Sequence, residues 1–539
     1  MTGADIMVRC LEAEGVDTIF GYPGVAICPF FNSILKSDIR SVLVRTEQNA
    51  AHAANGAART TGKVGVCVAT SGPGATNLLT GIATANADSI PLVCITGQVK
   101  TELIGRDVFQ EADVTGAAES FVKYSYLVKD IEDLPRVFKE AFHIASTGRR
   151  GPVLIDVPID VQLKEAAGFT YPESVNLRTY KPTVKGHAIQ IKKVMQEIEK
   201  AQRPVIMAGG GVLLSDARDE LLEFAEKFDI PVASTMMAID AVPSSHRLNL
   251  GMVGNNGRRY ANRAINEADL LIVIGCRFAD RAVQQPSLIV KDKIVVHIDV
   301  DPAEIGKNAS ASIPLVGDAK HILQDFLKAD YKPMRRDAWI AVMDEYREKL
   351  NYHRNPNPEF VDPENFIQTL CNKMDDDGVY VADVGQNQIW SCRYSIIKKG
   401  RFLTSGGMGT MGYSIPAAMG VRAANPEKQV VAVCGDGSFQ MSMMELATIK
   451  QHNIPVKIVV LKNNVLGMVR EYQHYTYNDH YSMIDLSGSP DLEKIAAAYD
   501  IPFIRMYNME QKDAQIEAFL NAEGPVLMEC ILDPMDLVN

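Results

Sequence analysis

A Gly-Asp-Gly turn and an Asn-Asn pair stand at a spacing that could hold a metal ion. They follow the two apolar runs of CGDGSFQMSMMELATIKQHNIPVKIVVLKNN, which we predict to be strands 430–434 and 456–461 joined by a helix. In a right-handed crossover, the carboxyl ends of neighbouring parallel strands emerge at the same edge of the sheet. Asp436 and the Asn463 amide could then flank one Mg²⁺, which takes few protein oxygens and leaves room for phosphate and water.

The glycines of the same turn suit a phosphate group. Gly435 and Gly437 let the backbone approach closely, and the helix expected to begin near Ser438 directs its amide groups to the same place, an arrangement that binds anions. Each half also has a plainer interpretation, since Gly-Asp-Gly can be a tight turn and Asn-Asn a loop. Their separation by residues 438–462 favours a combined metal and diphosphate site.

Glu47 is a second acidic candidate. The strand SVLVRT turns into a helix of small residues whose first turn carries Glu47. A buried carboxyl group at that place could hydrogen-bond a bound cofactor. Two structural roles are also open: a carboxylate favoured by the positive end of the helix, or an ion pair with Arg45.

The elements that must position these residues recur three times. An apolar strand, a Gly-rich turn, a helix, an Ile-Pro step and a second strand start at Val64, Val205 and Val430, with 27, 26 and 25 residues from the first valine to the proline. Near-continuous apolar strands are typical of parallel sheets covered by helices on both faces. We therefore predict an α/β fold with three doubly wound parallel-sheet domains.

The boundaries of these domains are expected in two polar, proline-bearing segments. LKEAAGFTYPESVNLRTYKPTVKGH and NYHRNPNPEFVDPEN have the composition of linkers. The predicted domains are residues 1–165, 185–335 and 360–539.

Composition favours a soluble protein with small-molecule partners. The chain has 539 residues, 47% of them hydrophobic, and a net charge of -11 without a long basic run, which argues against nucleic acid and anionic membranes. The N-terminus reads as a capped amphipathic helix, and no apolar stretch reaches ~18 residues. Nine scattered cysteines without a Cys-x-x-Cys pair are expected to be buried thiols in a reducing, cytoplasmic compartment: Cys10, Cys28, Cys67, Cys94, Cys276, Cys371, Cys392, Cys434 and Cys530.

Motifs along nearly the whole chain resemble one family. GDG followed by NN looks like the signature of thiamine-diphosphate enzymes. FGYPGVAICPFF, VRTEQNAAHAANGAARTTGK, SGPGATNLLTGIATANADSIPLVCITGQV, GPVLIDVPIDVQ, HIDVDPAEIGK and TSGGMGTMGYSIPAAMG follow, in order, the pattern of the acetohydroxyacid synthase (acetolactate synthase) catalytic subunit.

The resemblance implies a fold and an activity. The three domains would bind the pyrimidine of thiamine diphosphate, FAD, and the diphosphate with Mg²⁺. The activity would be decarboxylation of pyruvate and transfer of the two-carbon unit to a second 2-oxo acid, pyruvate or 2-oxobutyrate, in branched-chain amino acid biosynthesis toward valine, isoleucine and leucine. The implied assembly is a homodimer or homotetramer with the active site at the subunit interface, with room for a separate regulatory small subunit.

Site residues are carried over by position in the motifs. The catalytic group would be Glu47, Gln110 and Lys123, with Glu47 activating the cofactor. The metal ligands would be Asp436, Asn463 and the carbonyl of Val465. The thiamine diphosphate contacts would be Gln386, Gly409, Met411, Gly437, Ser438 and Met441, and the substrate-facing residues Val25, Phe109, Arg281, Met468 and Tyr472.

The middle domain carries a weaker signal. AGGGV after strand 205–208 can be a dinucleotide turn or simply a turn into a helix. Together with GCRFADR and two later aspartates it resembles the FAD site of the family, where the flavin does no net redox work. The implied contacts are Arg149, Gly209, Gly210, Gly275, Arg277, Asp299 and Asp318.

Four positions depart from the family pattern. Val25 replaces a glycine, Thr46 and Asn387 each replace a histidine, and Tyr472 replaces a tryptophan. We hypothesise that Val25 and Tyr472 alter the preference for the acceptor 2-oxo acid. The C-terminal ILDPMDLVN also stops short of the tail that the family folds over the site, which a truncated chain or a more open site would explain.

Four alternatives stand beside the acetolactate-forming carboligase. A flavin-dependent pyruvate oxidase would form peroxide, and a carboligase could use a different acceptor. A simple decarboxylase is disfavoured because no two of the 10 histidines are adjacent. The non-enzymatic alternative is a catalytically silent cofactor-binding scaffold.

Overall fold

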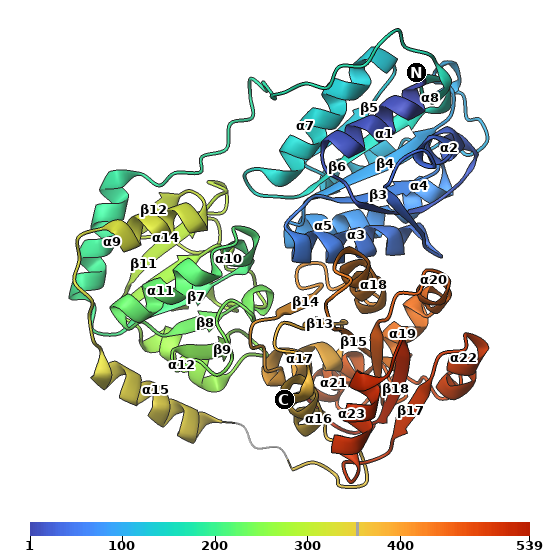
Figure 1. Cartoon of the computed structure of the whole chain (residues 1–539). Helices are drawn as coiled ribbons and strands as arrows, with labels where there is room; N and C mark the ends of the chain where they lie inside the picture. Colours follow the sequence, from blue (N-terminus) through green and yellow to red (C-terminus); the bar gives the residue numbers. More distant parts are fainter. Residues whose placement is uncertain (352–354, 539) are drawn as a thin grey trace. The chain divides into compact units, whose positions relative to one another are not determined.

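The computed structural model describes residues 1–351 and 355–538 and contains three six-stranded sheets (Figure 1). Two compact units share them. Unit 1 holds the first sheet and most of the third, and comprises Met1–Lys181, Gly378–Gln388 and Leu403–Asp536. Unit 2 holds the middle sheet and the remaining described residues. The α/β class and the three parallel sheets are as predicted, while the three domain boundaries remain predictions.

The first sheet has the strand order β2-β1-β3-β4-β6-β5, and its pairings are parallel. Val66 and Val68 of β3 face a core shared with α1 and α7, while Cys67 between them points to the other face, where α3 packs. The strands are β1 (Thr18–Tyr22), β2 (Arg40–Leu43), β3 (Gly65–Ala69), β4 (Leu92–Gln98), β5 (Tyr124–Leu127) and β6 (Pro152–Pro158). The helices are α1 (Gly3–Ala13), η1 (Val25–Ile27), α2 (Cys28–Ile34), α3 (Glu47–Thr61), α4 (Pro73–Asn77), α5 (Leu79–Asp88), η2 (Thr101–Leu103), α6 (Val114–Ala118), η3 (Glu119–Phe121), η4 (Ile131–Asp133), α7 (Leu134–Ser146) and α8 (Ile159–Leu163).

The third sheet repeats the topology of the first. Its order, β14-β13-β15-β16-β18-β17, is the same pattern shifted along the chain. The strands are β13 (Val379–Ala382), β14 (Arg401–Thr404), β15 (Val430–Gly435), β16 (Lys457–Lys462), β17 (Phe503–Met506) and β18 (Val526–Ile531). The helices are α16 (Pro363–Lys373), α17 (Gln386–Tyr394), α18 (Ser414–Ala424), α19 (Asp436–Ser442), α20 (Glu445–Gln451), α21 (Gly467–Tyr477), α22 (Leu492–Ala498) and α23 (Lys512–Asn521).

The middle sheet has a different topology, β12-β11-β10-β7-β8-β9. Counted from its own first strand, this is the order 3-2-1-4-5-6 of dinucleotide-binding folds, whose ligands lie where the strand order reverses. The strands are β7 (Pro204–Ala208), β8 (Val232–Ser234), β9 (Asn249–Met252), β10 (Leu270–Ile274), β11 (Ile294–Asp299) and β12 (Ile313–Val316). The helices are α9 (Ala188–Lys200), α10 (Gly210–Leu214), α11 (Arg218–Phe228), η5 (Met236–Ala238), α12 (Arg259–Glu267), α13 (Pro286–Ile289), α14 (Ala319–Lys328) and α15 (Asp337–Leu350).

The recurring unit differs from the prediction in its helix. Each strand pair is adjacent and parallel as expected, but two helices connect the strands instead of one: α4 and α5, α10 and α11, and α19 and α20. The first of the last pair begins at Asp436 rather than near Ser438. In each of the three repeats, the short first helix (α4, α10 or α19) therefore begins just after the carboxyl end of the first strand.

The termini and linkers follow the sequence closely. Thr2 and Asp5 form a capping box at the start of α1. Residues 164–187 contain no helix or strand, as expected of a linker. Part of the second predicted linker, residues 352–354, and the final residue of the predicted third domain lie outside the described residues. Among the helices of residues 1–351 and 355–538, none combines the length and apolar content needed to cross a bilayer.

The predicted burial of the cysteines holds with one exception. Eight of the nine are buried, whereas Cys28 at the start of α2 is exposed. All nine are free thiols.

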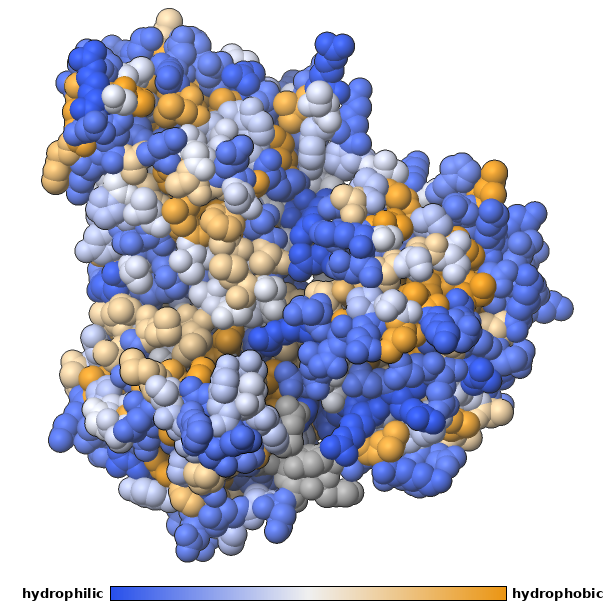
Figure 2. Space-filling model, turned by 180° about the vertical axis from the view of Figure 1, so that it is seen from behind, coloured by the Kyte–Doolittle hydropathy of each residue, from blue (hydrophilic) through white to orange (hydrophobic). Residues whose placement is uncertain are grey.

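On the face drawn in Figure 2, hydrophobic residues gather in patches between broad hydrophilic areas.

Unit 1 is joined by two helices that cross at small residues. A methyl group added to Gly56 of α3 would lie 2.1 Å from the Ala417 carbonyl oxygen, and one added to Gly420 of α18 would lie 1.9 Å from that of Ala53. The backbones can approach this closely only because both positions are glycine.

Candidate active site

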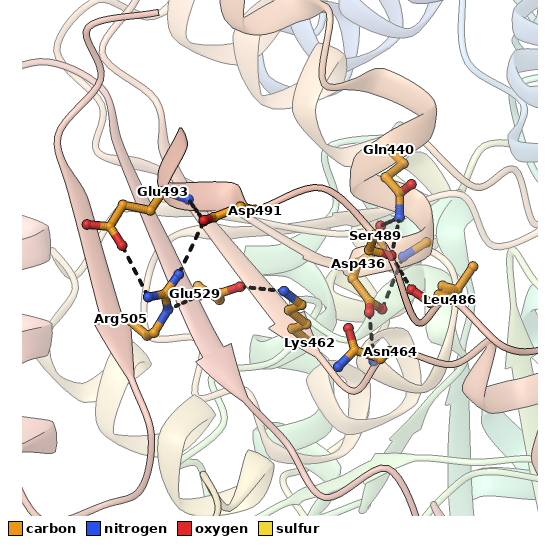
Figure 3. Close-up of polar contacts among 11 residues, drawn as sticks. Asp436, Gln440, Lys462, Asn464, Leu486, Ser489, Asp491, Glu493, Arg505 and Glu529 are labelled. Carbon is orange, nitrogen blue, oxygen red and sulfur yellow. Dashed lines mark hydrogen bonds and ion pairs between the residues drawn. The ribbon is translucent and has the colours of Figure 1, made fainter. Parts of the chain in front are cut away.

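The Gly-Asp-Gly turn and the Asn-Asn pair meet at one edge of the third sheet (Figure 3). The strands β15 and β16 pair in parallel, so their carboxyl ends are neighbours. The Asn464 backbone N–H donates to Asp436 Oδ2 over 2.8 Å, and the Gly437 N–H donates to Oδ1 over 3.1 Å. Ser438 holds the turn, because its hydroxyl bonds both the N–H and the carbonyl of Gly435 at 3.1 Å. The predicted convergence of the two motifs is therefore present.

Asn463 is bound into the same edge by Gln386. Its Nδ2 donates to Gln386 Oε1 over 3.1 Å, and its Oδ1 accepts the N–H of Val465 at the same distance. A Cβ on Gly467 would lie 1.9 Å from Gln386 Oε1, so a larger residue here would displace the Gln386 side chain from Asn463. The Gln386 amide in turn donates to Glu471 Oε2 and to the Asp536 carbonyl.

Val465 forms an isolated antiparallel bridge with Asp485, and the hydrogen bonds of this bridge do not involve the Val465 carbonyl. The bridge hydrogen bonds come from the N–H groups of Leu466 and Leu486, which donate to residues 484 and 464. In such a pair the N–H and C=O groups of Val465 itself point away from the bridging strand. Its N–H points to Asn463 Oδ1, so its carbonyl lies on the side of the candidate metal ligands.

The donor set fits a small divalent cation. Asp436 is 3% exposed, and burial raises the pKa of its carboxyl group to about 6 in the absence of a neighbouring metal. A cation would stabilise the ionised form, and one carboxylate, one amide oxygen and one carbonyl leave coordination positions for phosphate oxygens and water. Among the described residues there is no cluster of three or more His, Cys, Asp or Glu side chains of the kind that holds a metal.

A charged network fixes the end of β16 next to Asn463. Glu529 of β18 is fully buried and accepts a hydrogen bond from Lys462 over 2.9 Å, while Arg505 of β17 bonds its other oxygen (Figure 3). Arg505 also pairs with Glu493 at 3.2 Å and Asp491 at 3.6 Å. Three adjacent strands thereby hold the strand end that presents the candidate ligands.

Asp383 was missed by the sequence reasoning. This buried carboxylate follows β13 and accepts hydrogen bonds from the backbone N–H groups of Gly412 at 2.9 Å and Ser414 at 2.7 Å. Burial raises its pKa, while these hydrogen bonds lower it. A usable signal existed, because Asp383 directly follows the apolar run VYVA, as Asp436 follows the end of β15.

The loop that Asp383 holds brings the predicted thiamine diphosphate contacts together. Met411 Cε lies 3.5 Å from the position that a Cβ on Gly437 would take, and Met441 Cβ lies 3.1 Å from that of Gly412. Met441 is 54% exposed, so its side chain is free to contact a ligand. Gly409 adopts a φ of 70° in the same loop.

Glu47 begins α3 as predicted and is 8% exposed. Its Oε2 accepts a hydrogen bond from Asn77 over 2.9 Å. The ion pair with Arg45 that the sequence left open does not hold the Glu47 carboxylate, because the Arg45 guanidinium donates instead to Gln451 Oε1 and the Leu43 carbonyl. The helix-start interpretation is compatible with the structure, and a catalytic role stays a prediction.

Gln110 lies beside the loop that covers Glu47. Gly72 has a φ of 57°, and a Cβ there would be 2.9 Å from Gln110 Cα, while a Cβ on Gly74 would be 3.2 Å from Glu47 Oε1. Gln110 itself has a φ of 58°. The backbone of Gln110 therefore lies directly against the Gly-rich turn that follows β3. No hydrogen bond or ion pair between described residues joins Glu47 to Asp436 or Asn463.

Lys123 is engaged elsewhere. Its ammonium donates to the carbonyls of Ile144 and Thr147 and to the Tyr180 hydroxyl, at 2.8 Å for the last two. It thus holds the end of α7 to the linker, and its predicted catalytic role has no support from these contacts.

Most of the predicted substrate residues are exposed. Phe109 is 88% exposed, Val25 75% and Tyr472 59%, and Arg281 in unit 2 is also exposed. Met468 lies partly buried in the first turn of α21. Asn387, at one of the departures, has a structural role, since its Nδ2 donates to the Asp383 carbonyl over 2.8 Å.

The predicted flavin residues of unit 2 form a cradle at the point where the strand order reverses. Gly209 follows β7 and Gly275 follows β10, and a Cβ on Gly209 would lie 2.1 Å from the Gly275 carbonyl oxygen. A Cβ on Gly275, where φ is 59°, would lie 2.6 Å from Gly211 Cα. A backbone this close to another backbone suits a dinucleotide phosphate.

The other predicted flavin residues lie in different settings. Asp318 caps α14 and accepts a hydrogen bond from the Ser215 hydroxyl over 2.7 Å. Asp299 ends β11 and is 8% exposed. Gly210 and Arg277 lie in the two turns of the cradle. Arg149 belongs to unit 1, where its Nε donates to the Ser89 hydroxyl.

Three family profiles match the chain. They are the N-terminal TPP binding domain, the central domain and the C-terminal TPP binding domain of thiamine pyrophosphate enzymes, at residues 1–117, 191–326 and 383–530. Their limits contain the first strands of the first sheet, the middle sheet and the edge with Asp436 and Asn463.

Curated relatives resemble the chain over almost its full length. A probable acetolactate synthase large subunit of Methanocaldococcus jannaschii is 44% identical over 547 residues, which covers 99% of this chain and 93% of the relative. An acetolactate synthase of Arthrospira platensis is 42% identical, covering 98% and 94%. An acetolactate synthase of Mycobacterium bovis is 45% identical, covering 92% and 82%.

Proposed function

We propose a carboligase function from the premise that the chain belongs to the thiamine pyrophosphate enzymes and, within them, to the acetolactate synthase large subunits. The reaction is decarboxylation of pyruvate and transfer of its two-carbon unit to a second 2-oxo acid, pyruvate or 2-oxobutyrate. Thiamine diphosphate supplies the nucleophilic carbon for this chemistry when bound. The observation that carries the proposal is the meeting of Asp436, Asn463 and Gln386 at one sheet edge.

The third sheet provides the anchoring half of the proposed site. Asp436, Asn463 and the Val465 carbonyl would hold Mg²⁺, and the amide groups at the start of α19 would bind the diphosphate. The hydrogen bonds of Asp436 to Asn464 and Gly437 support this assignment, because they orient its carboxylate before any ligand arrives. Met411 and Met441 would give the cofactor its apolar support.

The first sheet provides the acid–base half. Glu47 would hold a proton against a ring nitrogen of the pyrimidine, and its burial beneath the turn of Gly72 and Gly74 would exclude water from that contact. Gln110, held against the same turn, would stand where the substrate arrives.

FAD is proposed for the middle sheet, in a structural rather than redox role. Support comes from the strand order of that sheet and from the close approach of Gly209, Gly211 and Gly275 at its reversal point.

The assembly proposed is a homodimer or homotetramer in the cytoplasm, with sites built by two chains and room for a regulatory small subunit. The name "large subunit" of the relatives supports a second polypeptide, and nine free thiols support a reducing compartment.

A product analysis tests the activity. Purified protein with Mg²⁺, thiamine diphosphate, FAD and pyruvate, with and without 2-oxobutyrate, should release CO₂ and form acetolactate or acetohydroxybutyrate without peroxide. Peroxide would identify an oxidase, and acetaldehyde alone a decarboxylase. No CO₂ from pyruvate or other 2-oxo acids would identify a silent scaffold.

The exposed Val25 and Tyr472 support an altered choice of acceptor. The double substitution Val25→Gly, Tyr472→Trp should change the ratio of the two products when pyruvate and 2-oxobutyrate compete. An unchanged ratio would exclude these residues as the determinants.

A further inference from the structure

Unit 1 contains a cleft away from the residues of the candidate active site. It has a volume of about 310 Å³ and is lined by Arg40, Arg422, Pro426, Asn453, Ile454, Pro455 and Gly524. Its lining comes from β2, the end of α18 with the following turn, the Ile-Pro step before β16, and the turn before β18. None of these residues belongs to the candidate active site.

The two arginines of this cleft have no acidic partner. Arg40 donates only to the carbonyls of Ala423 and His452, over 3.4 and 3.3 Å, and Arg422 to that of Asn425 over 3.2 Å. Neither takes part in an ion pair with a described residue. A guanidinium has five N–H donors, so each arginine keeps donors free for a ligand.

Positive charge accumulates around the cleft although the whole chain has a net charge of -11. The Lys457 ammonium is held by the carbonyls of Ala522 and Gly524, and burial together with the charge of Arg422 lowers its pKa to about 8. Burial also lowers the pKa of Arg422, which the exposed Glu427 partly offsets. A bound anion would stabilise the charged forms of these partly buried cations.

The remaining lining consists of two prolines with Asn453, Ile454 and Gly524. Ile454 is 1% exposed, so Pro426 and Pro455 provide the apolar surface for an uncharged organic group next to the two guanidinium groups. The volume is at the lower end of the range for small-ligand sites, about 300–1,000 Å³, and exceeds the needs of a free phosphate ion.

We propose that this cleft binds a small phosphorylated metabolite, with its phosphate held by Arg40 and Arg422 and its organic part against Pro426 and Pro455. Planar guanidinium groups bind phosphate oxygens through paired, charge-assisted hydrogen bonds, which favours phosphate over an uncharged ligand. The inference concerns a site separate from the proposed catalytic one and does not depend on the activity.

Calorimetric titration of the holoprotein tests the proposal. The protein is first saturated with thiamine diphosphate, Mg²⁺ and FAD, so that its other phosphate sites are filled, and then titrated at constant ionic strength with ADP, inorganic phosphate, citrate and adenosine. ADP should bind and adenosine should not. Inorganic phosphate binding as tightly as ADP would identify the free ion as the ligand, and citrate binding more tightly than either would overturn the phosphate class.

Substitutions locate the binding. Arg40→Gln and Arg422→Gln should each weaken ADP binding about tenfold or more, since each removes charge-assisted hydrogen bonds to the phosphate. Arg9→Gln, which removes an exposed arginine of α1 outside the cleft, should leave it unchanged. Absence of ADP binding, or an affinity in both cleft variants equal to that of the unaltered protein, would overturn the proposal.

A milder pair of variants covers the case in which a glutamine variant does not fold. Arg40→Lys and Arg422→Lys keep the charge but lose the paired geometry, so the affinity for ADP should fall less than in the glutamine variants while remaining salt-dependent. Affinity equal to that of the unaltered protein in both lysine variants, without salt dependence, would count against the site.

Discussion

Glu47 is a buried carboxyl group that keeps one oxygen available. Asn77 donates to Oε2, and Oε1 faces the turn at Gly74. Glutamine has the same shape but cannot exchange a proton. We therefore expect Glu47→Gln to lower the rate of CO₂ release from pyruvate by about 10²–10⁴-fold, the usual contribution of a positioned acid or base.

The measurement is a rate assay beside a thermal unfolding scan. The midpoint of unfolding should stay close to that of the unaltered protein, because the Asn77 contact survives. Glu102→Gln, an exposed residue of the same unit, is the matched control and should keep full activity. An equally active Glu47 variant would remove this residue from the mechanism.

Asp156 is a titratable group that the proposed mechanism does not use. This residue of β6 is 1% exposed and accepts hydrogen bonds from Thr96 at 2.7 Å and Gln98 at 2.9 Å. Burial raises its pKa from 3.8 to about 7, against the lowering effect of these hydrogen bonds. Between these values the unfolded chain releases a proton that the folded protein retains, so the contribution of Asp156 to stability is fully present below about pH 4 and is lost as the pH rises to about 7.

The consequence for stability can be measured with Asp156→Asn. Asparagine does not titrate, so the variant should gain stability relative to the unaltered protein as the pH rises from about 4 to about 7, by up to about 4 kcal/mol, and the gain should then level off. Unfolding midpoints across this range provide the test. Asp113→Asn is the control of opposite sign, because hydrogen bonding lowers the pKa of Asp113. A pH-independent difference for Asp156→Asn would contradict the raised pKa of Asp156.

At the scale of elements, the crossing of α3 and α18 depends on Gly56 and Gly420. A methyl group at either place would meet a carbonyl oxygen of the other helix at about 2 Å, which neither backbone can avoid without moving. We expect Gly420→Ala to destabilise the protein by at least about 1–3 kcal/mol, the usual cost of overpacking.

Thermal unfolding of three variants tests this contact. Gly56→Ala should resemble Gly420→Ala, whereas Gly168→Ala, with nothing within 4 Å of the added methyl group, should be neutral. Unfolding midpoints equal to that of the unaltered protein for both helix variants would show that the helices do not approach as closely as described.

The turn at Gly275 makes a corresponding prediction for the flavin. Gly275→Ala adds a methyl group 2.6 Å from Gly211 Cα at a φ of 59°, which should open the cradle and abolish retention of FAD during purification. Gly306→Ala has a φ of 78° but open space around it, so it tests backbone strain alone and should keep the flavin. The readout is the flavin absorbance per chain. Equal flavin content in the two variants would place the flavin elsewhere.

Elements and site residues were predictable where the signal is local. The strands at Val64, Val205 and Val430 and the start of α3 at Glu47 follow from apolar runs, glycines and the Ile-Pro step. The break between α19 and α20 does not, because Met443 and Met444 keep helical dihedral angles and neither glycine nor proline marks it.

Long-range partners were also out of reach of the sequence. Asp383 can hold the loop at Gly412 only after that loop has folded back onto it. Lys123 bonds the hydroxyl of Tyr180, a linker residue that no local sequence pattern connects to it. Motif position alone could not distinguish Lys123 near a substrate from Lys123 holding a helix end.

For the whole molecule, the repeated topology of the first and third sheets suggests two complementary half-sites. Glu47 follows β2 in one, and Asp436 follows β15 in the other. If the site is built by two chains, Glu47→Gln and Asp436→Ala variants should be inactive alone. When equal amounts are unfolded and refolded together, about a quarter of the activity should return, because half the dimers are mixed and each has one intact site.

The control is the same mixture without unfolding and refolding, which should show less activity if subunits exchange slowly. A mixture that stays inactive after refolding, while the unaltered protein recovers, would place both residues in a site made by one chain.

The contact between α3 and α18 also has a consequence for how the chain is made. Gly56 of α3 lies against Ala417 of α18, and Arg59 of α3 donates to the carbonyl of Thr404, the last residue of β14, across a separation of 345 residues. At about 5–20 residues per second, a ribosome needs roughly 20–70 s to synthesise the intervening chain. During that time the alanine-rich face of α3 has no cover, so the nascent chain should depend on chaperones and should aggregate when translation stalls in the middle sheet.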